Sequence, residues 1–354
     1  KGMEHEPERG VRCTMCFDSP PKIDAPCRVS DAAPWLPTDP ISAGGSELSQ
    51  QSPDMASPLL HSDKSKPIGN ITDAYSLEVN AKDISALTAA APRVLPGSTI
   101  SIPYLANQDN DARLAAAQAV RGLGFEPMPH LAARRIASFA KLESFIQRAV
   151  AEAGVKRCFV IAGDPSTPLG PFGDSSSLIE SGVFERSGIQ MVGVGGHPEG
   201  HPVMSTSDRW KVLEHKCRCI EGRGMAPLIV TQFAFDADIV LAWLEALRGR
   251  GVEHPVRVGV PGPAGVAVLA RYAALCGVSA CASMLSKYGI SISKLFGIAG
   301  PDLFVDRLTT RLTEAHGKVS LHFFPFGGIA QSVKWVEQYC SRAEPEQPID
   351  TAPM

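Results

Sequence analysis

The feature that most constrains the fold is a regular alternation of short β-branched runs with longer segments of helical periodicity, which begins near residue 74. Eight runs have strand character: 74–79, 99–102, 126–128, 157–161, 190–194, 228–233, 257–260 and 320–324. Helical periodicity marks 83–91, 111–123, 135–153, 175–187, 208–222, 236–248, 265–276, 302–316 and 329–340, with two extra helices at 279–288 and 292–296. Repeated strand–helix units build a parallel sheet. Eight such units fit the roughly 250 residues of a (β/α)8 TIM barrel, an α/β fold.

A doubly wound open sheet is the alternative to the barrel. That fold places a glycine-rich turn after its first strand to bind a dinucleotide. The residues after Glu78 are Val-Asn-Ala, and the glycine-rich stretch 193–200 lacks the required spacing. The closed barrel is therefore the preferred prediction.

The two ends of the chain differ from this pattern. Residues 1–70 are rich in Pro, Ser and Asp and show no apolar period, which predicts a disordered or loosely packed extension. Residues 71–342 form the predicted catalytic barrel, and 343–354 a flexible tail.

Composition excludes several classes of protein. The hydrophobic fraction of 44% supports a sizeable core, and a net charge of −3 gives no reason to expect nucleic acid or an anionic membrane as partner. We find no apolar run of about 18 residues and no signal segment at the start.

The odd number of cysteines, nine, is typical of a reduced protein, so we expect a cytoplasmic location. Cys13 and Cys16 are followed only by Cys27, so no metal site is predicted there. The oligomeric state stays open, with a homo-oligomer among the expectations.

Polar residues gather where the predicted strands end, which is where barrels of this kind place their active sites. In chain order these residues are Glu78, Tyr104, His130, Asp164, His197, His201 and Gln232, with Gly163 and Phe233 beside them. Glu78 matters most, because a carboxyl group inside an apolar strand loses solvation and its pKa rises. Such a group is a competent general acid near neutral pH.

Each of these residues also has a structural interpretation. Glu78 could point outward between helices or pair with a lysine, Asp164 could be a turn residue before Pro165, and Gln232 could be a satisfied core amide. His197 and His201 are spaced like zinc ligands, but Pro198 and Gly200 prevent the helix such a site needs, which favours a rigid loop. His215 and the charges at 216–218 are by default on the solvated face of a helix.

Five motifs in the same order resemble those of methylenetetrahydrofolate reductase. They are Ser76-Leu-Glu78, Pro129-His-Leu131, Gly163-Asp-Pro165, His197-Pro-Glu-Gly-His-Pro202 and Val230-Thr-Gln-Phe-Ala-Phe-Asp236. The family has S-F-E, P-H-L, R-G-D-P, Y-P-E-x-H-P and I-T-Q-F-F-F-D at these places. The resemblance spans about residues 75–339.

The resemblance implies an oxidoreductase that interconverts 5,10-methylenetetrahydrofolate and 5-methyltetrahydrofolate with NADH or NADPH, through FAD, in one-carbon metabolism and methionine biosynthesis. Glu78 would protonate the folate amine as the methylene bridge opens. Asp164 would contact the pterin and tune the electron carrier, and Gln232, with Phe233 and Tyr104, would bind the folate. His130, Gly163, His197, His201 and Lys216 look like family positions near the flavin.

The departures from the family concern the flavin more than the folate. Ala162 replaces the arginine that would hold the cofactor's pyrophosphate, a charge-assisted contact. His197 replaces a tyrosine, Pro103 replaces a threonine, and Asp174-Ser-Ser-Ser177 replaces Tyr-Ala-Ser-Asp. The sequence thus leaves two routes open, hydride transfer through FAD or directly from the nicotinamide cofactor. Two other functions remain as alternatives: a pterin-binding barrel methyltransferase, and a non-catalytic folate- or flavin-binding homologue.

Overall fold

The computed structural model describes residues 71–105, 108–276 and 297–343. Eight parallel strands close into a barrel in the order β1-β10-β7-β6-β5-β4-β3-β2. Their bounds are β1 Ser76–Glu78, β2 Thr99–Ile102, β3 Glu126–Ala132, β4 Arg157–Ile161, β5 Met191–Gly196, β6 Ala226–Phe233, β7 Val256–Pro261 and β10 Val319–Phe324. The predicted (β/α)8 barrel is confirmed, with each predicted strand present.

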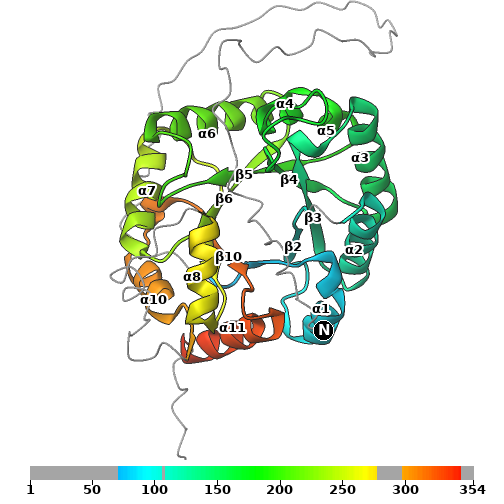
Figure 1. Ribbon diagram of the computed structural model, residues 1–354. Helices are drawn as coiled ribbons and strands as arrows, with labels where there is room; N and C mark the ends of the chain where they lie inside the picture. Colours follow the sequence, from blue (N-terminus) through cyan, green and yellow to red (C-terminus); the bar gives the residue numbers. More distant parts are fainter. Residues whose placement is uncertain (1–70, 106–107, 277–296, 344–354) are drawn as a thin grey trace, which may run out of the picture.

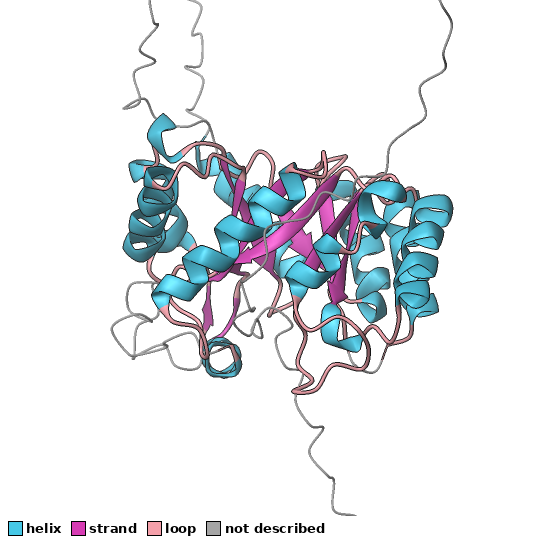
Figure 2. Ribbon diagram, turned by 90° about the horizontal axis from the view of Figure 1, so that it is seen from above, coloured by secondary structure: helices cyan, strands magenta, loops and turns pink. Residues whose placement is uncertain are grey.

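Helices surround the barrel, as Figure 1 shows, and in the perpendicular view the strands run between helices on both sides (Figure 2). They are α1 Ile84–Ala90, α2 Asn110–Gly122, α3 Phe139–Ala153, α4 Ser175–Glu180, α5 Val183–Arg186, α6 Thr206–Glu221, α7 Ala237–Gly249, α8 Val266–Leu275, α10 Asp302–Arg311 and α11 Ile329–Ala343. Within the described residues, no helix has both the length and the apolar character that crossing a membrane requires. The expectations for 1–70, 279–288, 292–296 and 344–354 lie outside the described residues.

The strands form because their residues are buried on both faces, as expected when helices cover a parallel sheet. In β10, Leu321 and Phe323 are fully buried, and so is His322 between them. Inside the barrel the Ser76 Oγ lies 2.8 Å from the His322 Nδ1, so β1 and β10 are also joined through side chains. The barrel interior is thus partly polar, and Glu78 follows Ser76 on the same face of β1.

Several predicted boundaries are wrong for identifiable reasons. Strand β3 continues through Pro129 to Ala132 rather than ending at residue 128. A proline lacks the N–H donor but keeps its carbonyl acceptor, so the strand can continue past it. The helix predicted at 175–187 is two helices, since Gly182 adopts a φ of 73° between them. The helix predicted from residue 135 begins at Phe139, where the Ser138 side chain accepts a hydrogen bond from the Lys141 N–H.

The seventh connection contains the predicted helix at 265–276, as α8, and a pair of short strands that the sequence did not reveal. Strands β8 (Ala264–Gly265) and β9 (Ile298–Ala299) pair antiparallel outside the barrel. Helix α8, drawn yellow, lies inside the outline of the outer helices near β10 (Figure 1). The predicted helix 302–316 is shorter, and a 3-10 turn, Glu314–His316, follows it. The seventh connection therefore brings a helix toward one end of the barrel, where its side chains take part in the candidate site.

Candidate active site

Glu78 is the last residue of β1 and lines a cavity of about 340 Å³ at the end of the strand. The Glu78 Oε2 lies 4.0 Å from the His322 Nε2. Burial lowers the pKa of His322 well below its usual value, and the charge of Arg257 lowers it further, so this imidazole is neutral. His322 therefore places no positive charge beside Glu78, whose carboxyl group is positioned to exchange a proton with a molecule in the cavity.

Aromatic rings form one wall of this cavity. The rings of Tyr272, from α8, and Phe326 are stacked with centroids 4.0 Å apart and an interplanar angle of 10°. Phe233 meets Phe326 edge-on at 5.1 Å and is itself only 1% exposed. The structure thus places Phe233 behind the wall rather than on its surface. Flat rings beside ionisable groups suit a flat heterocyclic ligand with a polar edge.

Gln232 lies in a bulge of β6. In the register of β6 against β7, Val230 pairs with Arg257 and Phe233 pairs with Gly259. Two residues of β6 therefore lie opposite one residue of β7, which is a β-bulge. The Thr231 hydroxyl donates to the Gln232 carbonyl and accepts from the Gly259 N–H at 2.8 Å. The Gln232 side-chain oxygen accepts from the Phe233 N–H at 3.1 Å. The bulge thereby fixes the orientation of this amide, which is buried.

The loop after β5 is tied to the end of β6 by Glu199. Its Oε1 accepts hydrogen bonds from the Phe235 N–H at 2.8 Å and the Asp236 N–H at 2.9 Å, at the start of α7. Burial raises the pKa of Glu199 to about 7, although these two hydrogen bonds oppose the shift. The sequence analysis did not single out Glu199. The feature that could have indicated it is an acidic residue between Pro198 and Gly200, in a loop already expected to be rigid.

Replacing Glu199 with Gln should remove a pH dependence of stability. The folded protein holds this proton up to about pH 7, whereas the unfolded chain releases it near 4.5, so wild-type stability falls as pH rises between these values. The loss amounts to at most roughly 3 kcal/mol. The glutamine cannot ionise and still offers an oxygen to both N–H groups. Urea unfolding at pH 5 and pH 8 measures the effect, with the exposed Glu253→Gln as control. An equal pH 5-to-pH 8 difference in wild type and Glu199→Gln would contradict the assignment.

His197 and His201 are brought together by the same loop. Their rings are in edge-on contact with centroids 4.8 Å apart. The Arg209 guanidinium donates to the His197 carbonyl at 2.6 Å and so fixes the loop to α6. The loop after β5 therefore brings the two histidine rings into contact near the end of that strand.

Tyr104 and Asp164 are joined through Arg135, from the 3-10 turn Ala133–Arg135. The Arg135 guanidinium makes two contacts with the Asp164 carboxylate, at 2.6 and 2.7 Å, and lies 5.7 Å from the centre of the Tyr104 ring. Asp164 is thus part of an ion pair, which sequence reasoning did not foresee because Arg135 comes from a different strand end. Its negative charge is balanced before any ligand binds.

A second cavity, of about 310 Å³, lies beside Tyr104 between α2 and α3. Arg113 and Arg135 both line it. Burial lowers the pKa of Arg113 to about 10, so the guanidinium stays charged at neutral pH. Among the described residues the Arg113 Nε has no hydrogen-bond partner. The Arg113 guanidinium, with its unused buried donor beside the Tyr104 ring, fits a ligand that carries phosphate and a ring.

The remaining predicted residues lie apart from both cavities. His130 is inside β3 rather than after it, and its ring packs on Phe159 at 4.7 Å. Burial lowers the pKa of His130 to about 3, so it carries no charge. Lys216 is only 2% exposed, so the prediction that it lies on a solvated helix face is wrong. Gly163 has a φ of 88°, and a side chain there would press on Ala132, which explains the glycine before Asp164.

Solved structures with similar architecture have low sequence identity to this chain. Dihydropteroate synthase from Thermus thermophilus is 11% identical with a TM-score of 0.43, covering 77% of this chain and 96% of that chain. The 3-dehydroquinate dehydratase from Aquifex aeolicus is 10% identical with a TM-score of 0.42, covering 77% and 99%.

Sequence comparison gives a relative among characterised proteins. Methylenetetrahydrofolate reductase 2 from Saccharomyces cerevisiae is 27% identical over 154 residues, which are 42% of this chain and 25% of the yeast protein. The match thus spans about a quarter of the length of that relative. The profile of the family described as methylenetetrahydrofolate reductase matches residues 82–323, more than half of the chain. The five strand-end motifs and this match agree, and the chain belongs to the methylenetetrahydrofolate reductase family.

Proposed function

We propose that this protein is an oxidoreductase that interconverts 5,10-methylenetetrahydrofolate and 5-methyltetrahydrofolate with NADH or NADPH. One observation carries the proposal: Glu78 ends β1 in a cavity of about 340 Å³ beside stacked aromatic rings. A folate pterin is flat and polar at its edge, and such a cavity can hold it against the rings. Family membership supports folate reduction as the reaction. In this proposal Glu78 supplies the proton that the reduction needs.

The reaction consumes one hydride and one proton. Protonated Glu78 donates its proton to the folate amine nitrogen, and the bond from that nitrogen to the methylene carbon breaks. The other nitrogen supplies electrons to the methylene carbon, giving an iminium ion. A hydride then adds to this carbon and leaves a methyl group, while the nicotinamide cofactor is oxidised. In the opposite direction the Glu78 carboxylate takes the proton back, so one residue serves both directions.

Gln232 and the aromatic wall orient the folate in this proposal. The bulge of β6 holds the Gln232 amide, and an amide can donate to and accept from the edge of a pterin. Phe233 supports the wall from behind. In this proposal the rings of the wall contact the substrate, and Gln232 and Phe233 align it without changing charge, so they act on affinity and alignment more than on proton transfer.

FAD is the proposed intermediate carrier, and the residues of the second cavity fit it. Arg113 would hold the negatively charged phosphates, and Tyr104 would contact a ring. Gly163, His197 and His201, which do not line this cavity, would contact the cofactor farther along the strand ends. Bound FAD would supply hydride transfer between the nicotinamide cofactor and folate. Arg135 does not replace the arginine that Ala162 lacks, because the Asp164 carboxylate already balances its charge.

The absorption spectrum of the freshly purified protein tests this proposal. We expect flavin bands that bleach with NADH or NADPH and recover when 5,10-methylenetetrahydrofolate is added. A colourless protein that oxidises the nicotinamide cofactor only with methylene folate would retain the folate reaction and exclude FAD. A protein that binds folate but shows no turnover with NADH or NADPH would contradict the proposed enzymatic activity and support a non-catalytic folate-binding homologue. Methyl transfer from 5-methyltetrahydrofolate without redox change would support the methyltransferase.

A further inference from the structure

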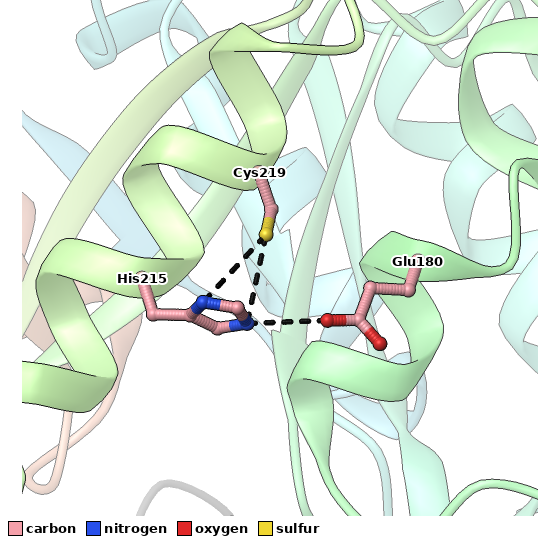
Figure 3. Close-up of side chains that lie close together, drawn as sticks. All are labelled: Glu180, His215 and Cys219. Carbon is pink, nitrogen blue, oxygen red and sulfur yellow. Dashed lines mark hydrogen bonds and ion pairs between the residues drawn. The ribbon is translucent and has the colours of Figure 1, made fainter. Parts of the chain in front are cut away.

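Three side chains with metal-binding atoms meet on the outside of the barrel, away from both cavities. Glu180 ends α4, and His215 and Cys219 both belong to α6 (Figure 3). The His215 Nε2 lies 3.1 Å from the Glu180 Oε1 and 3.6 Å from the Cys219 Sγ. All three ligand atoms lie within 4.8 Å of one another. None of the three residues lines the cavity of Glu78 or that of Arg113.

Local structure brings these atoms together. Residues four apart on a helix lie on the same face, so α6 presents His215 and Cys219 side by side. The end of α4 is held against α6 by Arg223, which donates to the Glu180 carbonyl at 2.9 Å and to the Glu185 carboxylate at 2.5 Å. Glu180 is therefore positioned by its backbone, while its side chain remains 42% exposed and able to turn toward a ligand.

The geometry does not suit a cysteine nucleophile. Such a site needs the thiol on one imidazole nitrogen and the carboxylate on the other, so that a proton passes through the ring. Here Glu180 contacts the Nε2, and the same nitrogen is also the closer of the two to Cys219, whose Sγ is 3.9 Å from the Nδ1. Cys219 is also only 1% exposed, which shields its sulfur from a substrate.

The distances match the edges of a zinc coordination polyhedron. Bond lengths of about 2.1 Å for nitrogen, about 2.0 Å for oxygen and about 2.3 Å for sulfur give tetrahedral edges of about 3.4 Å for N–O and about 3.6 Å for N–S. The two corresponding separations in the protein are 3.1 and 3.6 Å. A small movement of the exposed Glu180 side chain brings the third edge into range.

We propose that Glu180, His215 and Cys219 bind a divalent transition metal, Zn²⁺ in the first instance, with water as the fourth ligand. Sulfur, imidazole and carboxylate together are ligands that zinc accepts, whereas magnesium and calcium prefer oxygen alone. Cys219 binds as the thiolate and releases its proton to the solvent. The metal joins α4 to α6 and so stabilises the outer helical layer near β5 without entering the folate reaction.

Cobalt(II) in place of zinc gives a direct test on the full chain. Wild-type protein should bind one equivalent, with a thiolate-to-cobalt charge-transfer band in the near ultraviolet and visible bands of four-coordinate cobalt. Cys219→Ser should lose the charge-transfer band. Glu180→Gln, at a position where the side chain is 42% exposed, should weaken binding at least about tenfold. Zinc should displace the cobalt and raise the melting temperature of the wild type but not that of Cys219→Ser.

Matched controls separate this site from other histidines and thiols of the chain. His254 pairs with Glu221 at 3.5 Å without a cysteine in the group, so His254→Gln should leave binding intact while His215→Gln abolishes it. A variant with Cys13, Cys16 and Cys27 all changed to Ser should still bind one equivalent. A charge-transfer band that survives Cys219→Ser, or that disappears only in the triple variant, would overturn the proposal. Wild-type protein without that band at stoichiometric cobalt would overturn it too.

Discussion

Replacing Glu78 with Gln is expected to lower kcat for methylene-folate reduction by about 10²- to 10⁴-fold, the usual contribution of a positioned general acid. Folate affinity should change by no more than a few-fold, because the glutamine keeps the size and polarity of the side chain in the cavity. The neutral His322 offers no replacement proton, since burial holds its pKa far below the neutral range. Steady-state kinetics together with equilibrium folate binding measure the two effects separately.

Glu126→Gln is the matched control for this change. Glu126 is also a strand carboxylate, but it begins β3 at the opposite end of the barrel and pairs with Arg121. Its replacement should leave kcat unchanged and cost only a modest amount of stability. If Glu78→Gln keeps its activity within a few-fold, the acid is another residue, and Glu199, with its pKa of about 7, becomes the first candidate.

Replacing Gly259 with Ala should destabilise the protein by about 3 kcal/mol or more and weaken folate binding as well. A methyl group at Gly259 would lie 2.5 Å from the Thr231 carbonyl oxygen and 2.8 Å from the Gln232 backbone. These are backbone atoms that cannot turn aside, so β6 and β7 must separate at the bulge. The separation would move Gln232, which is why stability and folate affinity should fall together.

Gly249→Ala provides the comparison for Gly259→Ala. Gly249 is exposed at the end of α7, and a methyl group there meets nothing within 4 Å. Alanine is favoured over glycine in a helix by up to about 1 kcal/mol, so stability should stay constant or rise slightly. Thermal unfolding and folate titration of both variants give the result. Wild-type folate affinity in a destabilised Gly259→Ala protein would show that the bulge does not position Gln232.

The barrel was predictable from the sequence because its signals are local and repeated. Each strand is a short apolar run and each helix has an apolar face, and eight such units leave few alternatives to closure. Individual boundaries were less predictable. Strand β3 continues through Pro129 beyond the predicted end at residue 128, since a strand tolerates the loss of one donor. Gly182 breaks a helix whose residues otherwise fit the helical period.

The candidate site was predictable in part. Motif order identified the family, and position at a strand end identified Glu78, because parallel strands bring their carboxyl ends to one rim. Residues that act through distant partners escaped notice. Arg135 pairs with Asp164, 29 positions along the chain, and Glu199 binds N–H groups 36 and 37 positions away. No local period records such pairs, since they exist only after the strands have assembled.

By itself, then, the sequence determined the barrel, the family and the strand ends that carry the chemistry, since these follow from periodicity and from short motifs. The tertiary structure decided which side chains share an environment. It placed His130 and Lys216 in buried surroundings, balanced Asp164 with Arg135, and brought Glu180 to His215 and Cys219. Burial and charge depend on atoms contributed by several elements at once, and desolvation and ion pairing change a residue's properties only when those elements pack together.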